Sequence, residues 1–312
     1  MPIVAIVGAG LVGQGWAIVF ARAGWEVRLY DVAADRLAEA QALVEQQLYA
    51  LQAHGLLQDA EAIAARVQTA DSLDAALAGA AYVQENSPER LDVKRAVFGE
   101  LDALAPPETI LASSTSSIPA SLFTEHLSHR HRCLVAHPVN PPYLIPVVEI
   151  SGAPWTSADA IARTRDILAK VGQRPVVVRK EIEGFILNRL QGALLQEAFR
   201  LFRDGIASAE DIDTTIKDGL GLRWSFMGPL ETIDLNAPGG IADYCQRYGA
   251  MYASIGAAQA DCPAWDDALV KRLERERRER LPATDLPARR FWRDEQLMCL
   301  MRHKQRNGET NG

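Results

Sequence analysis

Two side chains near the middle of the sequence have the types that a proton transfer needs. His137 directly follows the apolar run 134–136, and Glu149 lies in the next apolar run, 147–150. An imidazole that titrates near neutrality can take the proton of a hydroxyl group, and a carboxylate can fix its tautomer and stabilise the imidazolium. A strand, a turn and a second strand would bring the two together. A structural histidine and a surface glutamate explain the same residues without catalysis.

A run of hydroxyl side chains at 113–117 (SSTSS) follows the apolar segment 109–112. Hydroxyls after the end of a strand are common turn residues. They are equally suited to hold an oxygen atom of a substrate. The residue types alone leave both interpretations open.

Three glycines, Gly8, Gly10 and Gly13, follow the apolar run 3–7 in the order G-x-G-x-x-G. In this arrangement the first glycine permits a tight turn, the second lets the backbone approach a pyrophosphate, and the third lets a helix pack closely on a strand. Backbone amides between these glycines and the following helix would then receive the diphosphate, and Leu11 and Val12 are the candidate cofactor contacts. This spacing predicts a dinucleotide site.

Asp31 ends the second predicted strand, 26–31 (EVRLYD). A carboxylate at the end of the second strand accepts both ribose hydroxyls of NAD and repels the 2′-phosphate of NADP. Strand, glycines, helix, strand and acid occur in the expected order, so the sequence predicts NAD as the cofactor. FAD fits the same fingerprint, but the histidine and hydroxyl motifs favour a nicotinamide.

The elements that position these residues alternate between strands and helices. Uniformly apolar short runs are typical of strands covered on both faces of a parallel sheet. We expect strands at 3–7, 26–31, 81–84, 109–112, 132–136, 147–150 and 174–179, and helices at 16–23, 33–66 with a break near His54–Gly55, and 157–171 with Ser157 as N-cap. The alternation predicts an α/β fold with a Rossmann-type doubly wound sheet.

The character of the chain changes after Glu183, where it becomes almost wholly helical. Apolar positions 186, 190, 194, 198 and 201 predict one buried helix stripe. Ser208-x-x-Asp211 resembles a capping box that opens the next helix. We therefore expect an NAD-binding domain at 1–183 and an all-helical domain at 184–312, whose long amphipathic helices would offer apolar faces for dimerisation.

Composition excludes several classes of function. The chain has 312 residues, 48% of them hydrophobic and 23% charged, with a net charge of −7. This acidic balance removes the general attraction that nucleic-acid or anionic-membrane binding would use. Gln14 and the glycines interrupt the apolar N-terminal stretch, and 271–280 alternates opposite charges as an exposed helix face does. We expect neither a nucleic-acid nor a membrane partner.

Neither the cysteines nor a histidine cluster predicts a metal site. Cys133, Cys245, Cys262 and Cys299 lie far apart without a C-x-x-C pair, which is typical of reduced thiols in a cytoplasmic protein. Three histidines lie close together at 126, 129 and 131, but arginines at 130 and 132 add positive charge between them. We interpret that cluster as a surface loop and expect no metal.

Five ordered segments resemble the 3-hydroxyacyl-CoA dehydrogenase family over essentially the whole chain: VGAGLVGQG, PERLDVK, ASSTSSI, VAHPVNPPYLIPVVEI and EGFILNRLQ. Within the family, the chain is most similar to the lambda-crystallin branch, whose enzymatic activity is L-gulonate 3-dehydrogenase. AHPVNPPYLIPVVE, GLGLRWSFMGPLETIDLNA and ARRFWRDEQLM carry that closer resemblance.

The resemblance implies catalytic roles for four residues. His137 would be the general base and Glu149 its orienting carboxylate. Ser116 would hydrogen-bond the reacting oxygen near the nicotinamide. Asn188 would be a second polar contact to the substrate.

The resemblance also implies cofactor contacts outside the glycine loop. Asn140 would hold the nicotinamide end, and Glu89 and Lys94 match the family's contacts in P-E-R-L-D-V-K. Two positions depart from the acyl-CoA enzymes: Ser114 stands where they usually have Asn, and Pro141–Pro142 alters the turn after Asn140. Both departures bear on the substrate rather than on the reaction.

Charge argues against coenzyme A as part of the substrate. In the acyl-CoA enzymes, the helical excursion after the second strand supplies basic residues for the phosphates. Here residues 37–65 contain no Lys or Arg but do contain Glu39, Glu45, Asp59 and Glu61. A sugar acid needs a cation for its carboxylate, and Arg223 in G-L-R-W is a candidate.

The resemblance thus implies a homodimeric, NAD-dependent oxidoreductase that oxidises the 3-hydroxyl of a small hydroxy acid, with L-gulonate as the favoured substrate. The alternatives are a 3-hydroxyacyl-CoA (3-hydroxybutyryl-CoA) dehydrogenase, a carnitine 3-dehydrogenase and a non-catalytic NAD-binding crystallin-like protein. Ser116, His137, Glu149 and Asn188 together argue against the last, because a structural role needs none of them.

Overall fold

The computed structural model describes residues 1–260 and 265–307. The chain divides into two compact units. The first holds residues 1–189 together with 291–307, and the second holds the described residues between 190 and 290.

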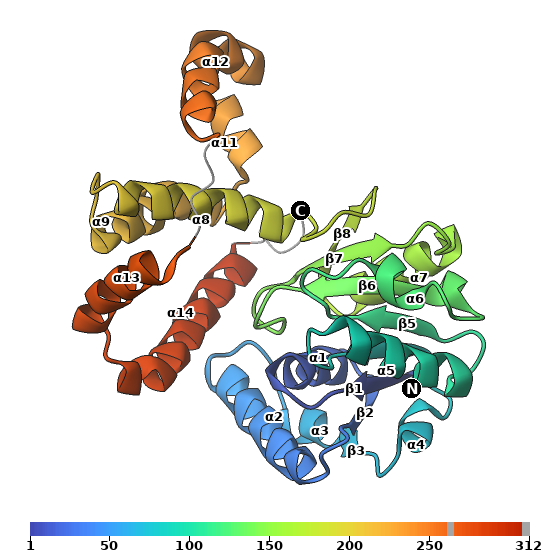
Figure 1. Ribbon diagram of the computed structural model, residues 1–312. Helices are drawn as coiled ribbons and strands as arrows, with labels where there is room; N and C mark the ends of the chain where they lie inside the picture. Colours follow the sequence, from blue (N-terminus) through green and yellow to red (C-terminus); the bar gives the residue numbers. More distant parts are fainter. Residues whose placement is uncertain (261–264, 308–312) are drawn as a thin grey trace. The chain divides into compact units, whose positions relative to one another are not determined.

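An eight-stranded sheet forms the centre of the first unit (Figure 1). Its strands are β1 (Ile3–Val7), β2 (Glu26–Tyr30), β3 (Val67–Thr69), β4 (Tyr82–Glu85), β5 (Ile110–Ser113), β6 (Cys133–Pro138), β7 (Val147–Gly152) and β8 (Arg174–Val178). The strand order is β3-β2-β1-β4-β5-β6-β7-β8, and every neighbouring pair is parallel except β6 and β7. That one antiparallel pair is the hairpin that carries His137 and Glu149.

Helices cover both faces of this sheet, so its strands need apolar side chains on both sides. The helices of the first unit are α1 (Leu11–Arg22), α2 (Asp35–Ala53), α3 (Ala60–Ala64), α4 (Leu73–Leu77), α5 (Leu91–Leu104), α6 (Ala120–Thr124) and α7 (Ala158–Lys170), with the short 3₁₀ turn η1 (Arg130–Arg132). In β1, Val4 and Ile6 pack with α1 and α2, while Ala5 and Val7 pack with α4 and α5. The continuous apolar runs in the sequence follow from this double burial.

The predicted α/β fold with a Rossmann-type sheet is confirmed. All seven predicted strands are present, with ends shifted by one or two residues. The predicted break at His54–Gly55 separates α2 from α3, and Ser157 Oγ caps α7 by accepting a hydrogen bond from Ala160 N. Strand β3 was not predicted, because its three residues include only one buried side chain.

The second unit is helical. It contains most of α8 (Leu187–Arg203), then α9 (Ala209–Thr214), the π-helical η2 (Thr215–Leu220), α10 (Gly221–Trp224), α11 (Pro229–Leu235), α12 (Gly240–Ala258), α13 (Asp267–Arg280), η3 (Ala283–Asp285) and the start of α14 (Leu286–Arg306). Ser208 Oγ accepts the Asp211 N–H at 3.1 Å, as the capping motif predicts. The prediction of one buried stripe on α8 is wrong, because Leu190 is 63% exposed and Leu194 is 37% exposed.

Residues 184–189 and 291–307, which include the last part of α14, belong with the sheet-containing unit, whereas the predicted helical domain held all of 184–312. The reason is hydrophobic: Met298, only 2% exposed, and Leu297 pack into the core beside α1 and α2.

Cys133 is buried, Cys245 and Cys299 are exposed free thiols, and Cys262 lies outside the described residues. Among the described residues, no helix combines the length and apolarity that crossing a bilayer requires.

Candidate active site

His137 and Glu149 are directly opposite each other in the antiparallel β6–β7 pair. Opposite residues of such a pair point to the same face of the sheet, so the register itself brings the side chains together. His137 Nδ1 lies 2.9 Å from Glu149 Oε2, and both side chains are buried, at 6% and 2% exposure. A carboxylate at Nδ1 fixes the tautomer with its proton there and leaves Nε2 to accept another proton.

The second oxygen of Glu149 holds the start of α8. Oε1 accepts the backbone N–H groups of Ile186 at 2.7 Å and Leu187 at 2.8 Å. Burial works to raise the pKa of Glu149, but the hydrogen bonds from His137 and from these two amides outweigh it and hold the pKa below its ordinary value. Glu149 therefore remains a carboxylate at neutral pH and can stabilise an imidazolium.

Phe185 lies against the imidazole in an unusual backbone conformation. Its ring centroid is 5.6 Å from that of His137, and the side chain is fully buried. Gly184 and Phe185 both have positive φ, +72° and +50°. A non-glycine residue in the left-handed region is uncommon and persists where its surroundings over-determine it. The turn at 184–185 delivers the two amides that Glu149 binds.

Ser116 and Asn188 form the second pair that the structure brings together. Asn188 lies in the first turn of α8, directly after Leu187, whose amide Glu149 binds. Its Nδ2 donates to the Ser116 carbonyl oxygen at 2.6 Å. Ser116 is exposed, and its hydroxyl makes no hydrogen bond to any described residue. The start of α8 thus connects all four residues of the predicted catalytic set within the first unit, Ser116 through its backbone carbonyl.

The glycine loop fits a dinucleotide. A Cβ at Gly13 would lie 1.9 Å from the Gly8 carbonyl oxygen, and a Cβ at Gly8, whose φ is +101°, would lie 2.8 Å from the Asn86 carbonyl oxygen. Both positions therefore require glycine to keep the turn closed. A Cβ at Gly10 would meet nothing within 4 Å, so this face of the loop is open to a ligand.

The start of α1 supplies the donors that a diphosphate needs. Gly10 is the N-cap, with no side-chain cap, so the first-turn amides at Leu11 and Val12 have no partner within the helix. Leu11 is 71% exposed. Open space above Gly10 beside unsatisfied amides is the arrangement that binds a pyrophosphate.

Asp31 stands at the end of β2 and supports the glycine loop. Its Oδ2 accepts the Ala9 N–H at 2.8 Å, and its Oδ1 accepts the Ala33 N–H at 2.9 Å. Each carboxylate oxygen has a second lone pair, so both ribose hydroxyls can still be accepted. The same Asp31 carboxylate thus stabilises the glycine loop and would bind the ribose hydroxyls.

Glu89 organises the hydroxyl run after β5. Its Oε1 accepts from Thr115 Oγ1 at 2.7 Å, from Ser116 N at 2.9 Å and from Ser117 N at 3.0 Å. Partial burial works to raise the pKa of Glu89, but the hydrogen bonds from Thr115 and Ser117 and the charge of Lys94 outweigh it and hold the pKa below its ordinary value. Glu89 fixes the backbone on which Ser116 stands.

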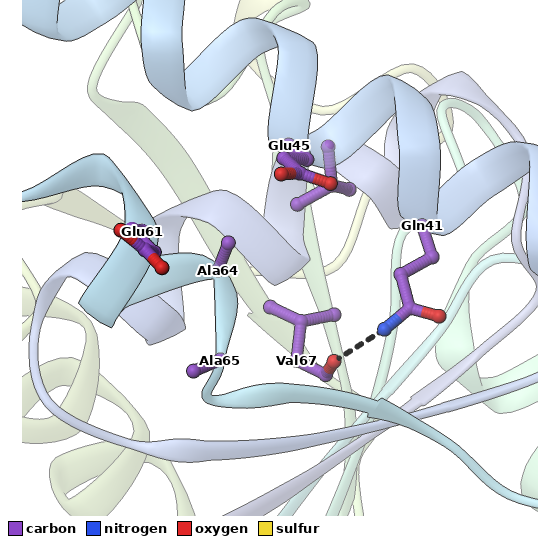
Figure 2. A pocket seen from close by; sticks show the side chains of 7 residues that line it. Gln41, Glu45, Glu61, Ala64, Ala65 and Val67 are labelled. Carbon is purple, nitrogen blue, oxygen red and sulfur yellow. Dashed lines mark hydrogen bonds between the residues drawn. The ribbon is translucent and has the colours of Figure 1, made fainter.

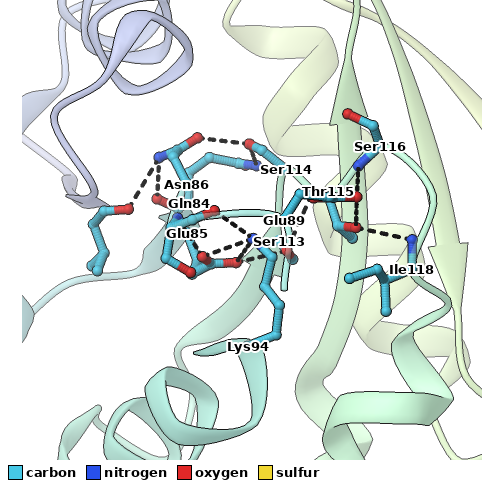
Figure 3. Close-up of polar contacts among 12 residues, drawn as sticks. Gln84, Glu85, Asn86, Glu89, Lys94, Ser113, Ser114, Thr115, Ser116 and Ile118 are labelled. Atoms are coloured by element: carbon cyan, nitrogen blue, oxygen red, sulfur yellow. Dashed lines mark hydrogen bonds and ion pairs between the residues drawn. The ribbon is translucent and has the colours of Figure 1, made fainter. Parts of the chain in front are cut away.

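Lys94 is buried beneath this loop rather than displayed on it (Figure 3). Its Nζ donates to both oxygens of Glu85 at 2.9 Å and to the Ser87 carbonyl at 3.0 Å. Ser113 Oγ also donates to Glu85, at 2.6 Å. With 1% exposure, Lys94 binds the end of β4 to α5, and its contact with the cofactor stays a prediction.

Ser114 is the centre of a separate network on the α1 side of the sheet (Figure 3). Its Oγ accepts from Trp16 Nε1 at 3.0 Å and from Gln84 Nε2 at 2.7 Å, and donates to Asn86 Oδ1 at 2.7 Å. Gln84 Nε2 also reaches the carbonyl of Ala136, which precedes His137. The network joins α1 to the ends of β4, β5 and β6.

Two predicted residues are not brought to this set. Asn140 is exposed in the 139–146 connection and makes no hydrogen bond to a described residue. Arg223 is exposed on α10 in the second unit. Their roles stay predictions.

Sequence reasoning missed the buried polar residues below the loops. Gln84 and Glu85 end a short strand of otherwise apolar residues, and a charged or amide side chain there must find a partner. Lys94, nine residues after Glu85 on a helix, was an available partner for it. Trp16, fully buried on α1, also needs an acceptor for its indole N–H.

Three features of the first unit indicate an NAD-dependent dehydrogenase. They are the glycine loop after β1 of a Rossmann-type sheet, the acid after β2 and the buried histidine–carboxylate pair. The comparisons with known proteins agree. Residues 3–182 match the family model of the 3-hydroxyacyl-CoA dehydrogenase NAD binding domain, and residues 184–280 match that of the 3-hydroxyacyl-CoA dehydrogenase C-terminal domain. The chain belongs to the 3-hydroxyacyl-CoA dehydrogenase family, as the sequence motifs predict.

Several relatives cover most of the chain. It is 42% identical to lambda-crystallin of Oryctolagus cuniculus over 96% of each chain. It is 40% identical to L-carnitine dehydrogenase of Streptomyces coelicolor over 80% of this chain and 79% of the relative. The solved structure of 5-formyl-3-hydroxy-2-methylpyridine 4-carboxylic acid 5-dehydrogenase, an NAD+-dependent dismutase, superposes with a TM-score of 0.84 at 28% identity and covers 98% of this chain and 99% of that one.

Proposed function

We propose that the protein oxidises the 3-hydroxyl group of a small hydroxy acid, with L-gulonate as the favoured substrate. The observation that carries the reaction is the buried His137–Glu149 pair at 2.9 Å, tied through Glu149 to the turn that presents Asn188. A base, its orienting acid, a donor to the reacting oxygen and a second polar contact to the substrate are what oxidation of a secondary alcohol needs from the protein.

The chain's own residues handle the proton and the oxygen. Nε2 of His137 takes the hydroxyl proton, and Glu149 stabilises the imidazolium that results. The Ser116 hydroxyl donates to the reacting oxygen, and Asn188 holds a second polar group of the substrate. The glycine loop and Asp31 would hold NAD, which would supply the hydride acceptor for the carbinol carbon. The alcohol thus loses one proton and one hydride and leaves as a 3-keto acid.

The acidic surface after β2 favours a small acid over a coenzyme A ester. Residues 37–65 hold no Lys or Arg. Figure 2 shows Glu45 of α2 and Glu61 of α3 at the pocket between these helices and β3. The phosphates of coenzyme A would meet like charge there, where a basic surface would attract them.

The substrate's carboxylate needs a cation, and we propose Arg223 for it, because a guanidinium binds a carboxylate through two parallel hydrogen bonds. Arg223→Lys keeps the charge but loses that geometry. We expect the KM for the hydroxy acid to rise about tenfold with little change in NAD affinity.

The test is the rate of NADH formation with L-gulonate, 3-hydroxybutyryl-CoA, 3-hydroxybutyrate and carnitine. The proposal expects the highest kcat/KM for L-gulonate and loss of turnover in His137→Gln. A higher kcat/KM for 3-hydroxybutyryl-CoA or carnitine would move the protein to one of those activities, which the family and the carnitine dehydrogenase relative support. Silence with every substrate, despite NAD binding, would favour the non-catalytic, crystallin-like alternative.

We also propose that the protein is a homodimer formed through the second unit. Large apolar side chains are exposed there, which is costly for a monomer in water. They include Leu222, Trp224, Phe226, Leu230, Leu235, Tyr248, Met251, Tyr252 and Ile255. Light scattering should give twice the chain mass, and Phe226→Glu should shift that mass toward the monomer. A wild-type monomer would contradict the proposal.

A cytoplasmic location completes the proposal. Its support is the pattern of scattered cysteines, of which Cys133, Cys245 and Cys299 are free. Fractionation of the native host cells should recover the protein with cytoplasmic markers, and recovery with secreted or membrane fractions would contradict it.

A further inference from the structure

A cavity of about 340 Å³ lies in the first unit, and none of the residues that line it belongs to the candidate active site. Its walls come from the end of α1, the segment after α2, the 139–146 connection, the start of β8 and the last turns of α14. The lining residues are Arg22, Leu56, Tyr143, Leu144, Pro146, Gly172, Arg174, Met301 and Gln305. This volume falls within the range of small-molecule pockets, about 300–1,000 Å³.

Arg22, the last residue of α1, is the chemically distinctive group of this wall. Its Nη1 donates to the Tyr143 carbonyl oxygen at 2.8 Å. Burial lowers the pKa of Arg22 to about 10, and no Asp or Glu among the described residues forms an ion pair with it. A guanidinium has five N–H donors, so most of its capacity is uncommitted. A half-buried cation without a counter-charge favours the entry of an anion.

The other charged residue of the lining is also positive. Arg174 adds a second guanidinium at the start of β8, and no lining residue is acidic. Arg302 reaches Gly55, next to the lining residue Leu56. The charge of Asp294 acts on Tyr143, but Asp294 is itself paired with Arg293 at 2.6 Å. In a chain with a net charge of −7, this concentration of positive charge is a local exception.

Much of the remaining lining is hydrocarbon. Leu56, Leu144, Pro146 and Met301 contribute apolar surface. A fully hydrated inorganic anion would gain nothing from that surface, whereas a carboxylate with a short hydrocarbon portion would use both the charged and the apolar lining.

We propose that this cavity is a second, non-catalytic binding site for a small organic carboxylate, held by Arg22 and packed against the apolar wall. A ligand in this cavity would contact the segment that joins His137 to Glu149, because Tyr143 belongs to that segment and lines the cavity. The neighbouring Pro142 packs directly on Gly15 of the cofactor helix, where an added Cβ would lie 2.7 Å from its ring.

Calorimetric titration of the NAD-saturated full chain with hexanoate tests the proposal, with hexanamide as the neutral probe of equal shape. We expect hexanoate to bind and hexanamide to bind about tenfold more weakly or not at all. Arg22→Gln keeps a donor for the Tyr143 carbonyl but removes the charge, and Met301→Trp fills the cavity without changing its charge. Both variants should weaken hexanoate binding about tenfold or more.

Arg66→Gln is the matched control. Arg66 also donates to the end of α1, to the Ala21 carbonyl at 2.9 Å, but does not line the cavity. This variant should bind hexanoate like the wild type, and NAD affinity and the thermal melt should be unchanged in all three variants. Absence of hexanoate binding at tens of millimolar overturns the proposal, as does equal binding by the Met301→Trp variant. If Arg22→Gln fails to fold, Met301→Trp alone decides the outcome.

Discussion

The side-chain amide of Asn188 donates to the carbonyl oxygen of Ser116 at 2.6 Å, across 72 residues of sequence. The two residues come from the start of α8 and from the loop after β5, and both belong to the first unit. The proposed substrate contacts are therefore held together before any ligand arrives. Preorganisation of this kind spares the cost of ordering side chains during the reaction.

Asn188→Asp tests that contact, because it replaces the donor with a carboxylate that repels the Ser116 carbonyl. We expect kcat/KM for the hydroxy acid to fall about tenfold or more, with NAD affinity unchanged. Steady-state kinetics and a cofactor titration measure the two quantities. Asn236→Asp, an exposed asparagine at the end of α11, is the matched charge control and should behave as wild type.

His137→Gln removes the base but keeps a hydrogen-bonding side chain of similar size. Turnover should fall on the order of 10²–10⁴-fold, because a positioned general base contributes about that much. NAD binding, followed by fluorescence, should be intact. His129→Gln is the control, since His129 also lies beside a carboxylate, Asp102 at 3.3 Å, but is exposed. Loss of cofactor binding in His137→Gln would contradict the assigned role.

Asp31→Ala should weaken NAD binding and reduce discrimination against NADP. The carboxylate that would bind the ribose hydroxyls is lost, and so are the acceptors of Ala9 N and Ala33 N that shape the loop. The ratio of the two dissociation constants is the decisive measurement. An unchanged ratio would count against Asp31 as the cofactor discriminator. Asp35→Ala, an exposed acid at the start of α2, provides the control.

The stability contributed by Glu149 should depend on pH in a defined direction. Its folded pKa lies below the ordinary value of 4.5, so its contribution is fully present above pH 4.5 and is lost as pH falls through the folded pKa. At pH 7, Glu149→Gln should destabilise the protein by about 1–3 kcal/mol. Denaturant unfolding at a series of pH values should show this difference shrinking in acid. A difference that stays constant down to acid pH would rule out the linkage; Glu125→Gln, on an exposed acid, is the control.

Ser114→Ala should affect stability, whereas Ser116→Ala should affect turnover. Loss of the Ser114 hydroxyl leaves the buried donors of Trp16 and Gln84 without their acceptor, at a cost of about 1–3 kcal/mol. The exposed Ser116 hydroxyl has no such partners, so its removal should lower kcat and leave unfolding nearly unchanged. Equal stability of the two variants would show that the Ser114 network is dispensable.

Most of the sheet could be predicted from sequence because its central strands, β1 and β4 to β7, are buried on both faces. Helical segments separate most of these strands along the chain. β3 escaped prediction because a short edge strand needs only one buried residue, Val67. The glycine loop was predictable because a side chain at position 8 or 13 would clash with a backbone carbonyl. Only glycine fits at these positions, so their spacing is visible in the sequence. The position of residues 291–307 was not, because only tertiary packing of Met298 decides it.

The site shows the same division. The β6–β7 hairpin could be anticipated from two apolar runs and a proline-rich turn, and with it the meeting of His137 and Glu149. The attachment of Glu149 to the amides of 186–187 could not, because backbone donors carry no sequence signal. The burial of Lys94 with Glu85 likewise depends on the angle at which α5 lies on the sheet.

Because one hairpin supplies both His137 and Glu149, the proposed acid–base pair forms within a single local unit. Mutations elsewhere can reshape what enters the site without disturbing the distance that the strand register imposes. Family members whose names point to different substrates are the expected result of such independence. A designer seeking a new substrate for this scaffold should therefore leave the hairpin untouched and vary the loops and helices around it.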